Sequence, residues 1–427
     1  MADAAALVRD RDVLGIPLGP GHPNAFLHAL GTRPSFDELV VTGALLTDFY
    51  ELFDRPGVRY VSGFYGPIER MLADAGGPVE FVPADFRRFA PVLEEVAPRV
   101  MATSAAPPDD DGYCSLSLHA GATVGELHRA ARDPERTLIV EVSPHFPRTH
   151  GLLPGHPHRI HVNDIDVLVE SDARPFALMD PPATDVDRTI ASLVANYVRD
   201  GATLQTGIGG IPGTVVSLLA DDVGGGYGIH SEMFTTGLMR LHQAGKVTNA
   251  SKGIFADFSV TTFALGEPEL YAWLADNSDV RFLPVDVVNS PDTISANVDM
   301  VSINGALAVD LAGQAVADTR DGRQFSGIGG HEDFVASSGL QLEDRSLICL
   351  RSTATVEGVV RSRITARFDA GTIITTPRHQ LDVVITEYGA AELRGRTVRE
   401  RAVALAQIAH PDFRDDLVAQ AEVWPPT

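Results

Sequence analysis

The sequence predicts an α/β protein in which short buried strands alternate with amphipathic helices. Apolar, largely β-branched runs of about four to six residues recur along the chain, which is typical of parallel strands covered on both faces. Stretches with a helical repeat of apolar residues lie between these runs. Apolar residues make up 44% of the 427-residue chain and charged residues 21%, values that fit an ordinary globular protein. The alternation of the two patterns indicates an α/β architecture.

Individual elements follow from the two patterns. The strand pattern occurs at residues 60–62, 137–142, 166–170, 203–206, 347–350 and 382–386. The helical pattern occurs at residues 23–30, 67–75, 121–131, 185–199, 233–244, 269–276 and 397–409. In the helix predicted at 185–199, Asp185 fits an N-cap and Gly201 fits a C-cap.

A linker divides the chain into two parts. Residues 171–184 hold three prolines and have no apolar periodicity, which is typical of a linker. We therefore expect one α/β domain over residues 1–175 and a second over residues 185–427. Each part carries a Gly-rich turn that runs into a proline and a helix, from Gly19 and from Gly207. This similarity fits two related domains, and chance recurrence is the alternative because such junctions are common.

The charge balance narrows the class of protein. The chain has 34 basic and 57 acidic residues and a net charge of −23, which argues against nucleic-acid binding and against an anionic membrane surface. It holds no apolar run long enough to span a membrane and no apolar signal-peptide core near Met1. Its only cysteines are Cys114 and Cys349. We expect no disulfide framework and a reducing cytoplasm.

Arginines are concentrated near the C-terminus. Between residues 351 and 401 there are nine, at positions 351, 361, 363, 367, 378, 394, 396, 399 and 401. Guanidinium groups bind phosphates in a bidentate manner, so this segment is a candidate anion site. The alternative is that these arginines pair with acidic neighbours on solvated surfaces.

Two loops share the sequence Gly-Ile-Gly-Gly. The first, Gly207, Ile208, Gly209 and Gly210, follows a predicted strand and precedes a helix; the second ends at Gly330. Backbone N–H groups in such loops bind phosphates or oxyanions. A tight structural turn explains a single loop equally well.

Glu232 lies in the run GIHSEMFTTG (228–237), just before a predicted helix. A carboxylate there is either a first-turn helix residue or a nucleophile. Asn289 and Asn304 follow apolar runs, and either amide could donate to an oxyanion or occupy a turn.

Five of the 14 histidines, at positions 145, 150, 156, 158 and 161, lie in one Pro- and Gly-rich stretch. Their spacing matches no usual zinc motif, so we expect loop histidines and no metal site. No carboxylate partner of His145, His150 or His230 can be recognised in the sequence.

Several longer runs, taken together, resemble the acetyl-CoA hydrolase/CoA-transferase family, which includes 4-hydroxybutyrate, butyrate and succinate:acetate CoA-transferases. The runs are EVSPHFPRTHG (141–151), GIHSEMFTTGL (228–238), TTFALGEPELY (261–271), VDVVNSP (285–291), MVSINGALAVDLAGQ (300–314), SGIGGHEDF (326–334) and TEYGAAELRGRTVRERA (386–402). They occur in order over nearly the whole chain. The resemblance implies two similar CoA-transferase domains with the active site between them.

The resemblance also implies roles for single residues. Glu232 would be the nucleophile, and Asn289 and Gly330 would form the oxyanion hole. The glycine loops would line the coenzyme A site through Gly207, Ile208, Gly209, Gly210, Gly327 and Gly329. Relatives commonly have Asp where this chain has Thr236, a difference that bears on acyl preference.

The expected activity is transfer of CoA from an acyl-CoA to a short-chain carboxylic acid, through a glutamyl-CoA thioester. An acyl-CoA hydrolase that uses the same glutamate is the main alternative, and a non-catalytic acyl-CoA-binding protein is a remote one. We expect no cofactor beyond the substrate coenzyme A, and a homodimer.

Overall fold

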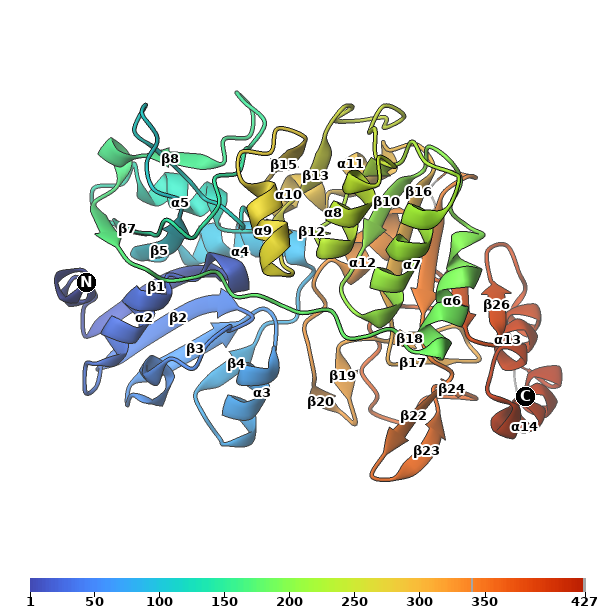
Figure 1. Cartoon of the computed structure of the whole chain (residues 1–427). Helices are drawn as coiled ribbons and strands as arrows, with labels where there is room; N and C mark the ends of the chain where they lie inside the picture. Colours follow the sequence, from blue (N-terminus) through green and yellow to red (C-terminus); the bar gives the residue numbers. More distant parts are fainter. Residues whose placement is uncertain (339–340, 425–427) are drawn as a thin grey trace.

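The computed structural model describes residues 1–338 and 341–424 and contains two parallel-stranded sheets, one in each half of the chain (Figure 1). The N-terminal half lies on one side of the molecule with the N-terminus at its edge, and the C-terminal half lies on the other. Residues 171–184 form neither helix nor strand and run across the molecule from one half to the other. The predicted α/β architecture is confirmed.

The N-terminal sheet has seven strands in the order β4-β3-β2-β1-β5-β7-β9. All of its pairings are parallel. Its strands are β1 (Arg11–Leu18), β2 (Glu38–Ala44), β3 (Val58–Ser62), β4 (Val79–Phe81), β5 (Val100–Ala105), β7 (Thr137–Val142) and β9 (Val167–Glu170). The helices of this half are α1 (Ala2–Ala6), α2 (Asn24–Gly31), α3 (Pro67–Asp74), α4 (Phe89–Val96) and α5 (Val124–Ala130), and a small hairpin pairs β6 (Tyr113–Ser115) with β8 (Arg159–His161).

The C-terminal sheet has six strands in the order β11-β10-β16-β21-β25-β26. It is parallel except for its last, antiparallel pair. Its strands are β10 (Thr203–Thr206), β11 (Gly228–Ile229), β16 (Met300–Gly305), β21 (Arg345–Cys349), β25 (Val383–Thr386) and β26 (Gly389–Glu392). The helices of this half are α6 (Asp185–Ala195), α7 (Gly210–Asp221), α8 (Thr236–Gln243), α9 (Pro268–Leu274), α10 (Val285–Val288), α11 (Pro291–Ser295), α12 (His331–Ser337), α13 (Val398–Gln407) and α14 (Pro411–Glu422).

Short strand pairs complete the C-terminal half. They are β12 (Met233–Phe234) with β14 (Phe263–Ala264), β13 (Ser259–Thr261) with β15 (Val280–Phe282), β17 (Ala308–Asp310) with β18 (Ala315–Val316) and β24 (Ile364–Thr365), β19 (Thr319–Arg320) with β20 (Arg323–Gln324), and β22 (Thr353–Val356) with β23 (Val359–Ser362). The pairs β12–β14 and β13–β15 lie between the two large sheets in Figure 1.

The central strands of both large sheets are buried on both faces, as the continuous apolar runs predict. In β5, Met101 belongs to one hydrophobic cluster and Ala102 to another. In β21, Leu347 and Ile348 are divided in the same way. The largest cluster contains residues of both halves, such as Leu118 and Phe234. The two halves therefore share one core.

The predicted ends of three helices are wrong. Helix α6 is capped by Thr184, whose hydroxyl accepts from the Asp187 N–H at 3.2 Å, and it ends at Ala195 with an Asn196 C-cap, so Gly201 does not cap it. Helix α8 begins after Thr235, whose hydroxyl accepts from the Leu238 N–H. Helix α5 does not include Gly121, whose N–H donates to the Thr262 carbonyl. No helix among the described residues is long and apolar enough to cross a membrane.

Candidate active site

A cavity of about 660 Å³ lies between the two halves of the chain. The N-terminal half supplies Leu18, Phe64 and Phe86 to its wall, and the C-terminal half supplies Glu232, Phe263 and Gly330. Most of the lining is apolar, so the few polar groups in it are candidates for chemistry.

The backbone of Glu232 is fixed from one side. Glu232 lies between β11 and β12, and its carbonyl accepts from the Thr261 hydroxyl at 2.9 Å and from the N–H groups of Thr262 and Phe263 at 3.0 and 3.3 Å. The preceding His230 is fully buried, and its Nε2 is 2.7 Å from the Val288 carbonyl oxygen. These contacts leave only the side chain of Glu232 free to project into the cavity.

The amide of Asn289 joins Glu232 to a second carboxylate. Asn289 is fully buried at the end of α10, and its Nδ2 donates to Glu232 Oε2 at 2.6 Å and to Asp333 Oδ2 at 3.0 Å. Both N–H bonds of the amide are therefore in use. Asn304 lines the cavity too, but its amide pairs with Gln205. The structure brings Asn289, and not Asn304, to Glu232.

The surroundings of Glu232 favour its neutral form. Burial raises its pKa to about 8, and the nearby Asp333 adds to that rise, while the Asn289 hydrogen bond lowers the pKa. The pKa of Asp333 is raised to about 6, mainly by burial, with Asn289 and Arg87 acting in the opposite direction. A carboxyl with so high a pKa inside a cavity is a candidate for a functional group.

The second glycine loop packs directly against this carboxyl. A Cβ on Gly330 would lie 1.9 Å from Glu232 Oε2 and 2.5 Å from Asn289 Nδ2. A Cβ on Gly327 would lie 2.6 Å from the Phe64 ring. Gly329 has a φ of +56° and a carbonyl that accepts from the Phe86 N–H at 2.9 Å. Only glycine permits this close approach.

The first glycine loop contributes less to the cavity. Gly207 and Ile208 are in its wall, together with Gly327, Gly329 and Gly330 of the second loop. Gly209 and Gly210 are not among the described residues that line it. Gly210 begins α7 and packs against Asp187 instead. The structure thus brings the two loops to one cavity, and the expected CoA contacts of Gly209 and Gly210 remain predictions.

Sequence reasoning missed two residues that support the site. Asp333 is the last polar residue of the run SGIGGHEDF, but nothing in that run indicates that it would reach Asn289. Arg87 comes from the other half of the chain, and its Nε lies 3.2 Å from Asp333 Oδ1. No local pattern marks Arg87, because its role depends on how the two halves pack.

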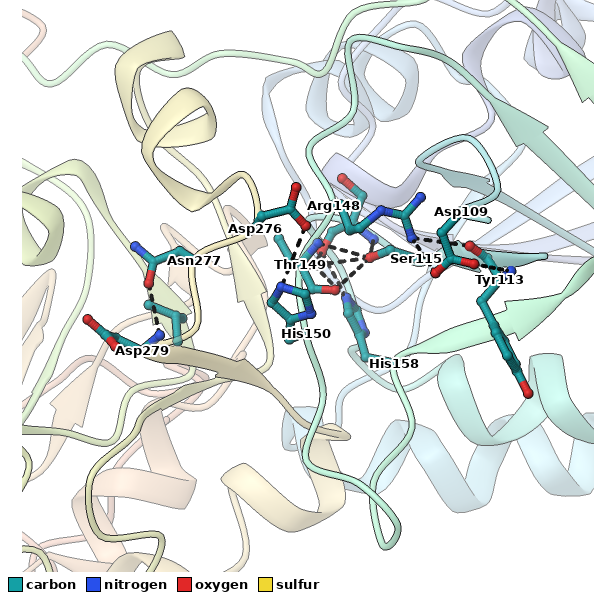
Figure 2. Close-up of polar contacts among 12 residues, drawn as sticks. Asp109, Tyr113, Ser115, Arg148, Thr149, His150, His158, Asp276, Asn277 and Asp279 are labelled. Carbon is teal, nitrogen blue, oxygen red and sulfur yellow. Dashed lines mark hydrogen bonds and ion pairs between the residues drawn. The ribbon is translucent and has the colours of Figure 1, made fainter. Parts of the chain in front are cut away.

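Two histidines of the histidine-rich stretch, His150 and His158, lie among polar contacts separate from Glu232 (Figure 2). His158 Nε2 lies 2.8 Å from the Ser117 carbonyl oxygen and 3.1 Å from the Thr149 hydroxyl. His150 lies 3.7 Å from Asp276, a residue of the C-terminal half, and Figure 2 shows this pair beside Thr149. The structure describes no group of three or more potential metal ligands.

The structure gives carboxylate partners to His145 and His150, which the sequence does not reveal. His145 Nε2 is 2.7 Å from Asp172 Oδ1, and His150 faces Asp276, but neither histidine lines the cavity. His331 does line it, with its Nε2 2.9 Å from the Thr376 hydroxyl and 3.6 Å from Glu332 Oε1. Burial lowers the pKa of His331 to about 4, so its imidazole is neutral at physiological pH.

The arginines of residues 351–401 lie away from the cavity. Arg351 forms an ion pair with Asp187 at 2.8 Å, and Arg394 forms one with Asp382 at 2.9 Å. None of the nine is among the described residues of the cavity wall. For Arg351 and Arg394, pairing with acidic neighbours is the interpretation that the structure supports.

The raised pKa of Glu232 predicts a pH-dependent cost in stability. A carboxyl that is neutral in the fold but ionises when unfolded contributes stability that is fully present below pH 4.5 and is lost as the pH rises towards 8. Between pH 5 and pH 8 the loss is on the order of 4 kcal/mol. Glu232→Gln has no group that ionises here and so avoids this loss. The free energy of unfolding of Glu232→Gln, relative to that of the wild type, should therefore increase from pH 5 to pH 8. Denaturant titrations at pH 5, 6.5 and 8 measure this difference, with the exposed Glu95→Gln as control. Parallel curves for Glu232→Gln and wild type would contradict the assigned environment.

The chain is similar to known proteins over nearly its whole length. Residues 266–421 match the model of the acetyl-CoA hydrolase/transferase C-terminal domain. The chain is 35% identical to succinyl-CoA:cyclohexane-1-carboxylate CoA transferase of Geobacter metallireducens, over 98% of this chain and 93% of that protein. It is 38% identical to 4-hydroxybutyrate coenzyme A transferase of Clostridium kluyveri, over 84% of this chain and 81% of that protein.

A solved structure agrees with these matches. The crystal structure of RipA from Yersinia pestis superposes with a TM-score of 0.89 at 33% identity, covering 99% of this chain and 96% of that chain. Acetyl-CoA hydrolases are more distant relatives. The resemblance found in the sequence is therefore confirmed, and the chain belongs to the acetyl-CoA hydrolase/transferase family.

Proposed function

We propose that this protein is a CoA-transferase that moves CoA from an acyl-CoA to a short-chain carboxylic acid. The observation that carries the proposal is the Glu232 carboxyl in the cavity, held by the Asn289 amide at 2.6 Å and in contact with the Gly330 backbone. A carboxylate at such a place is suited to covalent catalysis. The names of the two relatives, both CoA-transferases, support the same activity.

The first half-reaction would begin with release of the Glu232 proton to solvent water before the cavity is filled, and the carboxyl would take a proton back from solvent after the second half-reaction. The carboxylate oxygen then attacks the thioester carbonyl carbon, the C–S bond breaks, and an acyl-glutamyl anhydride and CoA thiolate form. The thiolate attacks the glutamyl carbonyl carbon and expels the original acid as a carboxylate. A glutamyl-CoA thioester remains on the protein, and a second carboxylic acid reverses the same steps to leave as the new acyl-CoA.

The contacts of Glu232 support a role for Asn289 in these steps. When the thiolate attacks the glutamyl carbonyl, a negative charge develops on a glutamyl oxygen, and Asn289 Nδ2 already lies 2.6 Å from Oε2. A donor fixed at the place where charge develops stabilises the transition state without reorganisation. Asp333 would hold the amide in that orientation, and the close approach of Gly330 would place its backbone beside the same oxygen.

The remaining features of the proposal concern partners and surroundings. We propose that the glycine loops bind coenzyme A, that the reaction needs no metal or other cofactor, and that the protein works as a homodimer in the cytoplasm. The two cysteines are free and buried, which agrees with a reducing compartment.

A hydrolase is the second candidate because of one observation. His331 lines the cavity next to Gly330, with Glu332 at 3.6 Å. A neutral histidine beside a carboxyl group can act as a general base for water, and the low pKa of His331 makes it a weak one. In that case water instead of a second acid would attack the covalent intermediate.

The covalent step can be trapped. Acyl-CoA alone should load the wild type, and borohydride should then reduce the glutamyl thioester and inactivate the protein irreversibly. Mass spectrometry should locate a hydroxymethyl group in place of the carboxyl in the Glu232 side chain. Glu232→Gln should bind acyl-CoA but should show no hydroxymethyl product after borohydride treatment. A mass change located on His230 or Ser231 instead would rule out Glu232 as the nucleophile.

Gly330→Ala should abolish most of the activity while the protein stays folded. The new Cβ would lie 1.9 Å from Glu232 Oε2, so the carboxyl must move, and displacements of about 1 Å cost about 10²-fold in rate. The measurement is kcat for transfer beside a thermal unfolding curve. Gly155→Ala is the matched control, since a Cβ there meets no atom within 4 Å. Equal activity of Gly330→Ala and the wild type would show that the loop does not press on the carboxyl.

Steady-state kinetics separate the transferase from the hydrolase. With acyl-CoA varied at several concentrations of acetate, propionate, butyrate or succinate, a transferase gives parallel double-reciprocal lines. Acyl-CoA loss without added acid should be at least about 10²-fold slower, because a base that delivers water contributes about 10²–10⁴-fold. Acid-independent loss at full rate that disappears in His331→Gln would establish the hydrolase instead.

A further inference from the structure

The linker between the two halves contains a run of four apolar residues. Residues 176–179 are Phe, Ala, Leu and Met, with Pro175 before them and Pro181 and Pro182 shortly after. Connecting segments are usually rich in small and polar residues, so an apolar run in one needs an explanation. Proline restricts the backbone of its own residue and of the residue before it, and the run is therefore bounded by stiff positions.

Alternate residues of this run form part of the cavity wall. Phe176 and Leu178 line the cavity that holds Glu232, whereas Ala177 and Met179, which the structure also describes, do not. Met179 is 65% exposed. Residues two apart in an extended chain lie on the same side of it. The pattern therefore fits an extended segment that presents one face to the cavity.

Leu178 contacts the apolar side of the cavity. It is half-buried and packs against a hydrophobic cluster that includes Phe86, Phe263 and Leu265. These three residues are in the cavity wall as well. Leu178 therefore closes a wall to which the two halves and the linker all contribute.

Three hydrogen bonds hold the run against the C-terminal half. The Leu178 N–H donates to the Gly266 carbonyl at 2.9 Å. The hydroxyl of the buried Tyr271 donates to the Phe176 carbonyl at 2.5 Å and accepts from the Gly266 N–H at 3.3 Å. The backbone is therefore held at both residues that line the cavity.

One chain segment connects this part of the linker to the nucleophile. The Phe263 N–H donates to the Glu232 carbonyl, and Gly266, three residues further on, holds Leu178. Three residues span at most about 11 Å. Phe263 and Leu265, which lie between the two contacts, make this side of the cavity apolar, and an apolar wall suits a hydrocarbon chain. A chain that extends from the Glu232 carboxyl along this wall reaches Leu178 after several carbon atoms.

We propose that Leu178, with Phe176 beside it, limits the length of the acyl chain that the cavity accepts. The inference rests on the proposed function and adds a specificity-determining segment to it. One methylene group gained or lost against an apolar wall changes kcat/KM by about 10- to 200-fold. The linker then has two roles, since it joins the two halves and forms the end of the acyl pocket.

The experiment changes the volume of this side chain in both directions. The measured quantity is kcat/KM for straight-chain acyl-CoAs with two to ten carbons in the acyl group, in steps of two carbons, with propionate as the fixed acceptor. In Leu178→Ala, the acyl-CoA two carbons longer than the best substrate of the wild type should gain at least about 10-fold relative to that substrate. In Leu178→Phe, the best substrate of the wild type should lose at least about 10-fold relative to acetyl-CoA.

Two further variants test the position of the effect. Phe176→Ala should shift the preference in the same direction as Leu178→Ala, because both side chains belong to the wall. Met179→Ala is the matched control: it removes an apolar side chain from the same linker, one residue from Leu178 but outside the wall. This control should keep the order of acyl-CoAs found for the wild type.

Three results would overturn the inference. The first is an unchanged order of acyl-CoAs in both Leu178 variants. The second is a shift in Met179→Ala as large as that in Leu178→Ala, because the linker would then act through its conformation and not as a wall. The third is a wild type that prefers acetyl-CoA to every longer chain, since so short a chain does not reach Leu178.

Failure of folding and failure of the proposed function are recognised separately. If Leu178→Phe does not fold, Leu178→Ala and Phe176→Ala decide. A wild type that forms no glutamyl-CoA from any acyl-CoA overturns the proposed function itself, and borohydride trapping detects that case without any of the linker variants.

Discussion

The site depends on one side-chain amide that lies between two buried carboxyl groups. Asn289 Nδ2 donates to Glu232 and to Asp333 at once, so a carboxyl that moves either breaks its own hydrogen bond or draws the amide away from the other carboxyl. Burial raises both pKa values, and the shared amide opposes that rise. Hydrogen bonds between buried polar groups restrict the positions of the groups that they join. The position of Glu232 is therefore fixed by neighbours from three separate segments, and the chemistry gains a preorganised group.

This arrangement needs both halves of the chain. Arg87 from the N-terminal half pairs with Asp333, and the neighbouring Phe86 N–H donates to the Gly329 carbonyl. The 3₁₀ turn Phe86–Arg88 thus holds both the glycine loop and the carboxylate that orients Asn289. Separation of the halves would release both, and so a change in their packing reaches the reacting group directly.

The sequence predicted the helices and strands better than the contacts between distant segments. Strand 137–142 and strand 203–206 agree with β7 and β10 because continuous β-branched runs mark buried parallel strands. The start of α8 was misplaced because the side-chain cap of Thr235 overrides apolar periodicity there. Glu232, Asn289 and Gly330 were found through motifs, and the structure brings them together. The position of Arg87 in the site was not predicted. An ion pair between the two halves leaves no pattern in one segment of the chain.

The groups assigned to the proposed chemistry all come from the C-terminal half, whereas both halves line the cavity. Glu232, Asn289 and Gly330 all come from the C-terminal half, and the same three groups would serve both half-reactions, because the second reverses the first. They cannot distinguish one acid from another beyond its carboxyl group. Under the proposed mechanism, discrimination between acids would come from the cavity wall, to which the N-terminal half supplies Leu18 and Phe86 and the C-terminal half supplies Phe263. A change in that wall would then alter the preferred acid without disturbing the Asn289 amide and its two carboxyl groups, so the same proposed centre could serve acids with different chains.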